Sequence, residues 1–132
     1  MGNHSLLKTV STSGAPAAIG PYSQGVVAGN LLFVSGQIPL DPATGDFVKG
    51  GIEEKTHRVL MNLKAVVEAA GADLSHVVKT TIFLADLNHF STVNKIYAEY
   101  FKGIFPARST VQVSALPKGA EIEVEAVVYL PR

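Results

Sequence analysis

Two stretches of helical periodicity constrain the fold of this chain more than any other feature of its sequence. Residues 52–70 carry apolar side chains at helical spacing, and Gly71 follows where a C-terminal cap is expected. Residues 88–101 form a second such stretch, with Asn88 as the expected N-cap and an apolar stripe that includes Tyr97. Both helices need a partner surface for their apolar faces, and a sheet is the natural one.

Segments rich in β-branched and aromatic residues predict that sheet. Strands are expected over residues 30–38, 77–86, 109–116 and 121–130. Gly36 interrupts the first strand, which is typical of a bulge or of a close backbone approach. Residues 11–25 are rich in glycine, proline and serine, so they are interpreted as a loop.

This order of elements predicts a single domain over residues 1–132. Its class is expected to be α+β, a two-layer sandwich in which two helices cover one face of a mixed sheet. Because only two long helices are expected, the other face of the sheet needs a different cover. We therefore expect another subunit to lie there.

Composition supports association and argues against several classes of function. Charged residues make up only 17% of the chain, below the usual quarter, so part of the surface is expected to be hidden in an oligomer. Lys+Arg and Asp+Glu both number 11, and no basic stripe is visible, so a nucleic-acid partner is not expected. The absence of cysteine excludes disulfides, thiolate metal sites and a thiol nucleophile.

Motifs for metals, nucleotides and serine hydrolases are also missing from the sequence. No histidine spacing is typical of a metal site, and the sequence has no phosphate-binding glycine loop and no nucleophile elbow. The four histidines are interpreted as surface or boundary residues: His4, His57, His76 and His89. We expect neither a metal nor a cofactor.

The sequence predicts a cytoplasmic protein. No apolar run approaches the ~20 residues that span a membrane. The first ten residues, MGNHSLLKTV, resemble neither a signal peptide nor the arginine-rich transit segment that a mitochondrial location would favour.

The segment from residue 105 to residue 126 carries the candidate chemistry. Three acids, Glu121, Glu123 and Glu125, alternate with apolar residues, so they are expected to share one face of a strand. That face is either solvated or places one acid in a cavity where it handles protons. Arg108 stands directly before the strand expected over residues 109–116. It is either a surface charge or a residue that binds a substrate carboxylate, because a guanidinium group can donate to both carboxylate oxygens.

Four blocks of sequence give the chain a family resemblance. Three of the blocks are APAAIGPYSQG, VSGQIPLDPATG and FPARSTVQVSALPKGAEIEVEA, and the fourth is the region from the first helix to the second. Together they resemble the reactive-intermediate deaminase family, also called Rid or YjgF. The resemblance extends from about Ala15 to Val128 and is closest to the enzymatically active RidA subgroup.

The resemblance implies both a fold and an activity. The implied fold is chorismate-mutase-like, in a homotrimer whose sheets form a central barrel with clefts between neighbouring subunits. The implied activity is cofactor-independent hydrolysis of enamine and imine acids, such as aminoacrylate, 2-iminopropanoate and 2-iminobutanoate, to keto acids and ammonia.

The resemblance also implies the site residues. It assigns binding of the substrate carboxylate to Arg108 and the essential acid to Glu123. The other substrate-binding positions fall on Tyr22, Ser35, Gly36, Asn88 and Thr110. Many bacterial members have cysteine where this chain has Thr110, which again excludes a thiol at that position.

Two other functions stay open at this stage. The family also carries an older description as a single-strand endoribonuclease and translation inhibitor. A non-catalytic trimer that only binds ligands in its clefts is the third alternative, although a binding module has no need of the acid Glu123.

Overall fold

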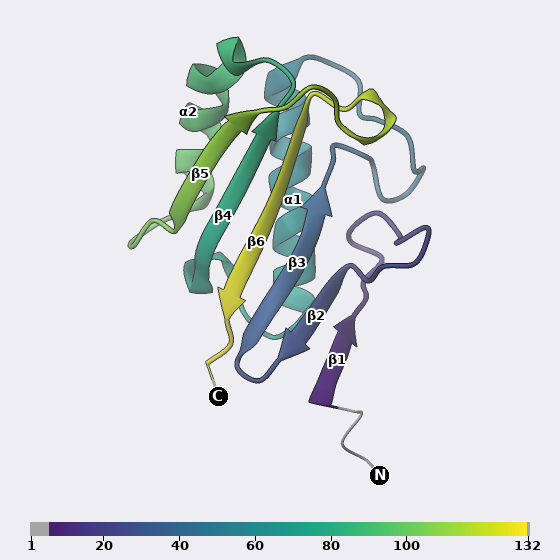
Figure 1. Cartoon of the computed structure of the whole chain (residues 1–132), viewed down its shortest axis with the longest axis vertical. Coiled ribbons are helices and arrows are strands. Elements are labelled where there is room, and N and C mark those ends of the chain that lie inside the picture. Colours follow the sequence, from purple (N-terminus) through teal and green to yellow (C-terminus); the bar gives the residue numbers. More distant parts are fainter. Residues whose placement is uncertain (1–5, 132) are drawn as a thin grey trace.

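Six strands form one mixed sheet with the order β1-β2-β3-β6-β4-β5 (Figure 1). All neighbouring strands are antiparallel except β4 and β5, which run parallel. The strands are β1 (Leu7–Val10), β2 (Gly25–Ala28), β3 (Leu31–Gln37), β4 (Val77–Leu84), β5 (Ala107–Gln112) and β6 (Ile122–Tyr129). This computed structural model describes residues 6–131, and His4 lies outside them.

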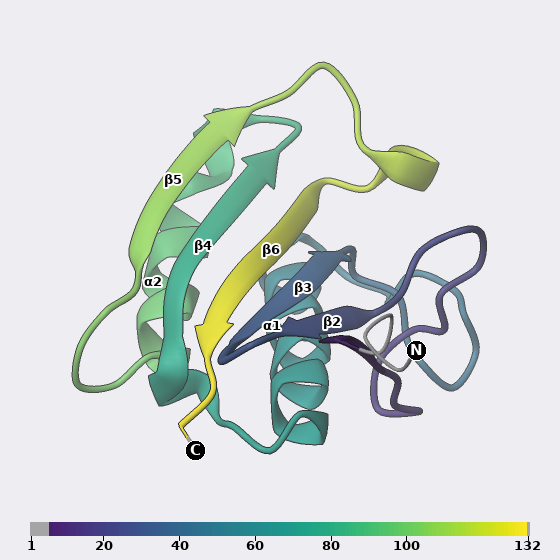
Figure 2. The same cartoon turned by 60° about the horizontal axis from the view of Figure 1, so that its bottom comes forward.

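Both long helices cover the same face of the sheet, as Figure 2 shows. Helix α1 (Ile52–Ala69) packs on β3 and β6, and α2 (Phe90–Tyr100) packs beside it. Short 3-10 helices join some of these elements: η2 (Leu74–His76), η3 (Leu87–His89) and η4 (Pro117–Gly119). The expected α+β class, with a mixed sheet and two helices on one face, is confirmed.

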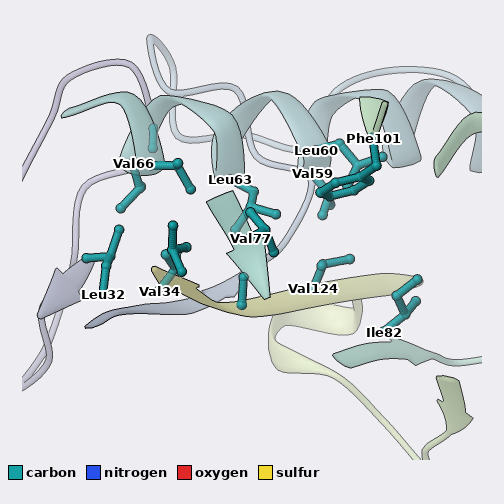
Figure 3. Packing of buried hydrophobic residues seen from close by; sticks show 14 of the residues in the cluster. Leu32, Val34, Val59, Leu60, Leu63, Val66, Val77, Ile82, Phe101 and Val124 are labelled. Carbon is teal, nitrogen blue, oxygen red and sulfur yellow. The ribbon is translucent and has the colours of Figure 1, made fainter. Parts of the chain in front are cut away.

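The core lies between α1 and the middle of the sheet, where apolar side chains from the two layers meet (Figure 3). Each fully buried aliphatic side chain contributes roughly 1.5–3 kcal/mol to folding. Val59, Leu63 and Val66 of α1 are completely buried, as are Leu32 and Val128 of the sheet.

Among the described residues, neither helix is both long and apolar enough to cross a bilayer.

The helix-free face of the sheet remains apolar in a single chain. Phe33 of β3 and Val127 of β6 are partners in the ladder on this face. The exposed fractions of Phe33, Val111 and Tyr129 are 46%, 41% and 44%, which is high for large apolar side chains. Several large apolar side chains exposed on one face of a sheet are typical of a surface that meets another protein.

Two of the predicted boundaries that differ from the structure lie at predicted site residues. Asn88 was expected to cap the second helix, but it lies inside η3, and its backbone N–H donates to the Asp86 carboxylate over 2.9 Å. The Asp86 cap begins a tight 3-10 turn, so α2 itself starts only at Phe90. Arg108 was expected before its strand, yet it lies within β5 and pairs with Thr80 of β4.

Candidate active site

A pocket of about 610 Å³ lies where β3 ends beside the start of β6. Its walls come from the loop before β2, the turn after β3, and η4. Glu123 lines it together with three predicted site residues, Tyr22, Ser35 and Gly36. The structure therefore brings four of the expected residues to one place.

Gly36 is where the backbone of β3 makes room for the Glu123 carboxyl group. The ladder pairs Val34 with Ala126 and Gln37 with Val124, so β3 has one extra residue here, which forms a β-bulge. A Cβ atom on Gly36 would lie 2.7 Å from Glu123 Cδ, closer than real Cβ contacts allow. The expected bulge and close approach at Gly36 are both confirmed.

This setting changes the acidity of Glu123. Partial burial raises the pKa of its carboxyl group above the ordinary value, and the nearby charge of Glu125 raises it further. Lys118 of η4 lines the same pocket, and it is the one non-glycine residue between residues 6 and 131 with a positive φ, of 59°. A carboxyl group that holds its proton to higher pH is suited to acid–base work near neutrality.

Ser35 fixes the loop that presents Tyr22 to the pocket. Its backbone N–H donates to the Gln24 carbonyl over 3.0 Å, and its hydroxyl donates to the Ser23 carbonyl over 2.5 Å. The Tyr22 side chain remains half exposed at the pocket. The Ser35 hydroxyl thus holds the loop in place, while the Tyr22 side chain faces the open pocket.

Arg108 occupies a second pocket, of about 420 Å³, against α2. Its Nη1 donates to Asn94 Oδ1 over 2.9 Å. The guanidinium carbon lies 5.0 Å from the ring centre of Tyr97 and 5.5 Å from that of Phe90, within the range of cation–π attraction. These three residues of α2 orient a planar cation that has no carboxylate partner among the described residues.

Arg108 and Glu123 lie on opposite faces of the sheet. Arg108 pairs with Thr80, whose hydroxyl bonds the Tyr97 hydroxyl beneath α2 over 2.7 Å. Glu123 pairs with Phe83, three residues further along β4 and therefore on the other face. A single chain does not bring the two predicted catalytic residues together.

Asn94 is the site residue that the sequence analysis missed. Asn88, which was predicted instead, lies in η3, and only its backbone contact with Asp86 is found. Asn94 is four residues after Phe90 and three before Tyr97, so it is the polar member of an otherwise apolar stripe on α2. That break in the stripe was the signal that could have identified it.

The remaining predicted residues have different environments. Thr110 lies two residues after Arg108 on the same face of β5, and its buried hydroxyl has no hydrogen-bond partner within the described chain. Glu121 was expected to share a face with Glu123, but it precedes β6 and pairs with Lys55 of α1 over 3.3 Å. The predicted shared face is therefore wrong for Glu121 and holds for Glu123 and Glu125, which line one pocket.

Two of the histidines in the described part of the chain contact side chains outside the candidate site. His57 Nδ1 lies 2.7 Å from the Tyr100 hydroxyl, and His76 lies beside Asp73. Over residues 6–131, no three histidine or acidic side chains converge to hold a metal ion.

Comparisons with known proteins identify the family to which the chain belongs. The sequence model of the family described as Endoribonuclease L-PSP matches residues 12–130. The chain is 52% identical over 120 residues to the human 2-iminobutanoate/2-iminopropanoate deaminase, covering 91% of this chain and 88% of the human one. The chain belongs to the Endoribonuclease L-PSP family, which includes the Rid proteins.

Solved structures of Rid-family members share this fold. A conserved Rid-family protein from Yersinia pestis superimposes with a TM-score of 0.92 at 53% identity, covering 94% of this chain and 99% of the other. Escherichia coli TdcF, solved with bound serine, gives a TM-score of 0.87 at 41% identity, covering 94% of this chain and 99% of the other. The resemblance read from the sequence blocks is thereby confirmed.

Proposed function

We propose that this protein hydrolyses small imine and enamine acids, such as 2-iminopropanoate and 2-iminobutanoate, to keto acids and ammonia. The observation that carries the proposal is the Glu123 carboxyl group, half buried against the bare backbone of Gly36 with a raised pKa. It occurs in a chain that is 52% identical to a human protein named for deamination of these two imines.

The complete site is proposed to form between two copies of the chain. Arg108 and Glu123 face opposite sides of the sheet, so joining them requires a second subunit. The apolar helix-free face, with Phe33 and Tyr129 exposed, supplies a surface for that contact. A homotrimer around a central barrel, with one cleft at each subunit boundary, satisfies both requirements by cyclic symmetry.

In this cleft Arg108 would bind the substrate carboxylate. The guanidinium fork can donate to both carboxylate oxygens, which fixes the plane of the acid and the position of its imine carbon. Asn94 and the rings of Phe90 and Tyr97 already hold the guanidinium in one orientation. Little ordering would then be needed when a substrate binds.

Glu123 would carry the proton through the reaction. Water adds to the carbon of the protonated imine, and the carboxylate accepts the proton that the water loses. Glu123 then returns this proton to the nitrogen. As the C–N bond breaks and ammonia leaves, the carboxylate accepts the proton of the remaining hydroxyl, so that the carbonyl forms. The departing ammonia takes up this proton as ammonium, which returns Glu123 to its carboxylate form. The protonated imine is already an electrophile, so we propose that no cofactor takes part.

The solved relative with bound serine supports a ligand of this size and charge. Serine, in E. coli TdcF, carries the same α-carboxylate as the proposed substrates. The carboxylate is the group that the Arg108 fork is suited to bind.

A coupled assay tests this function. A pyridoxal-phosphate dehydratase generates the imine from threonine or serine, and keto-acid release is followed with and without this protein. We expect release to accelerate in proportion to the protein added. Release at the spontaneous rate, at every protein concentration, would contradict the proposal.

Endoribonuclease activity is the second candidate, because the family description names it. RNA affinity that falls steeply with added salt, together with cleavage that survives repurification, would favour this function. The balanced charge of the chain, 11 basic against 11 acidic residues, is not what a phosphate-binding surface usually has.

A further inference from the structure

Asn62 of α1 is a completely buried polar residue whose bonds leave its own helix. Its Nδ2 donates to the carbonyl oxygens of Ile38 and Leu40, over 3.3 and 3.0 Å. Its Oδ1 accepts from Arg58 Nε over 3.0 Å. The amide is thus fully used, and two of its bonds tie α1 to the turn after β3.

That turn is one wall of the Glu123 pocket. Ile38 and Leu40 both line the pocket, and they follow directly after the bulge at Gly36. Glu123 lies against this same bulge. A shift of the turn away from α1 would therefore widen the pocket beside the carboxyl group.

A second buried amide holds the opposite wall. Gln24 is only 4% exposed, and its Nε2 donates to the carbonyls of Thr12, Ala15 and Pro16 over 3.0, 3.2 and 2.8 Å. Its Oε1 accepts the Thr12 N–H over 2.6 Å. The loop that Gln24 holds by these hydrogen bonds continues from Pro16 to Tyr22, and both of these residues line the pocket.

We propose that Asn62 and Gln24 are positioning residues, which hold the two walls of the pocket at the spacing that keeps the Glu123 carboxyl group partly buried. The proposal rests on the proposed function of Glu123 in proton transfer. Neither amide lines the pocket, so both act through the backbone of its walls. Because burial is the largest cause of the raised pKa of Glu123, looser walls that admit water would bring that pKa back toward its ordinary value.

The kinetic test uses Asn62→Ala and Gln24→Ala with Thr56→Val as the matched control. Thr56 is also completely buried on α1, but its hydroxyl donates to the Ile52 carbonyl within the helix, over 2.6 Å. For Asn62→Ala we expect kcat for imine hydrolysis to fall roughly 10- to 100-fold, as for other small misplacements of reacting groups, with KM changed less. The acid limb of the pH–rate profile should move to lower pH, and Thr56→Val should retain the wild-type kcat and profile.

Two measurements do not depend on turnover. Amide hydrogen exchange reports on the opening of residues 38–40, and carboxyl NMR of Glu123 reports its titration directly. We expect Asn62→Ala to speed that exchange and to lower the titration midpoint. If wild type fails to hydrolyse imines while these shifts still occur, the proposed function is wrong and the positioning role stands.

The proposal is overturned if Asn62→Ala and Gln24→Ala both retain the wild-type titration of Glu123. It is also overturned if Thr56→Val moves the pH–rate profile as far as Asn62→Ala does, because loss of stability alone would then explain the effect. Should Asn62→Ala fail to fold, Gln24→Ala decides the question through the same titration.

Discussion

Three neighbouring glutamates show how far one residue's surroundings decide its chemistry. Glu121 pairs with Lys55 in the first turn of α1, over 3.3 Å. Glu125 lies more exposed at the bulge, and Glu123 is partly buried against Gly36. Burial raises the pKa of the Glu123 carboxyl group above its ordinary value, which suits this residue to proton transfer.

Replacing Glu123 with glutamine tests this role. Glu123→Gln retains the shape of the side chain but cannot accept a proton as a carboxylate does, so turnover should fall roughly 100- to 10,000-fold. Glu121→Gln is the matched control and should retain most of the activity, because Glu121 lies outside the Glu123 pocket and a partly exposed ion pair contributes little. Steady-state kinetics on both variants, with assembly mass checked first, gives the answer. Equal losses in the two variants would contradict the assignment.

The raised pKa of Glu123 also predicts how stability depends on pH. The folded state binds this proton more tightly than the unfolded state, whose pKa stays near 4.5. Its contribution to the free energy of unfolding is therefore full below pH ~4.5 and is lost as pH rises through the folded pKa. At pH 7 we expect Glu123→Gln to melt above wild type, and the gain should vanish in acid. Melting curves across pH check this, and an unchanged difference at all pH values would exclude it.

At the scale of elements, β5 and α2 together present the arginine. Arg108 lies on the strand, while Asn94, Phe90 and Tyr97 on the helix fix its guanidinium group. The buried hydrogen bond between Thr80 and Tyr97 in turn fixes the helix on β4. The arginine is thus held by two packed elements rather than by a loop.

Arg108→Lys keeps the positive charge but removes the paired N–H donors of the guanidinium group. Lysine is a compact point charge that cannot bind both oxygens of a planar carboxylate or stack on Tyr97 in the same way. We expect kcat/KM for imine hydrolysis to fall about 100-fold, as is usual when a substrate loses its orientation. Wild-type kinetics for this variant, measured in the coupled assay, would exclude the clamp role.

Sequence periodicity located the elements best where they are long and amphipathic. The prediction for α1 was correct to one residue, since its apolar stripe recurs over 18 residues and Gly71 ends it with a φ of +89°. The strands β1 and β2 were missed, because four residues are too few to show alternation and Gly25 begins the second. The start of α2 was misplaced because Asp86, and not Asn88, supplies the capping oxygen.

The sequence predicted some residues of the candidate site but not Asn94, and it did not predict how the residues are arranged. The family resemblance identified Glu123 and Arg108, and the bulge at Gly36 could be expected from a glycine within a strand. Which face Arg108 occupies depends on the parallel register of β5 on β4, which pairs Arg108 with Thr80. No local sequence pattern predicts how β5 is aligned with β4. The separation of Arg108 from Glu123 could therefore be seen only in the folded structure.

At the scale of the whole molecule, the apolar helix-free face and the divided site point to the same assembly. We expect size-exclusion chromatography with light scattering to give about three times the chain mass of 13.9 kDa. Burial of Phe33 and Tyr129 at the subunit contact supplies the physical reason. A monomer mass at micromolar concentration would contradict the proposed trimer.

Mixing two inactive chains tests whether each site joins Arg108 of one subunit to Glu123 of another. Arg108→Ala and Glu123→Gln are co-expressed in equal amounts, and the assembled protein is assayed for imine hydrolysis. In a cyclic trimer assembled at random, about one quarter of the sites combine an intact Arg108 with an intact Glu123. We predict recovery of about a quarter of wild-type activity. No recovery above the separate variants, in a mixture shown to contain mixed trimers, would contradict a site shared between subunits.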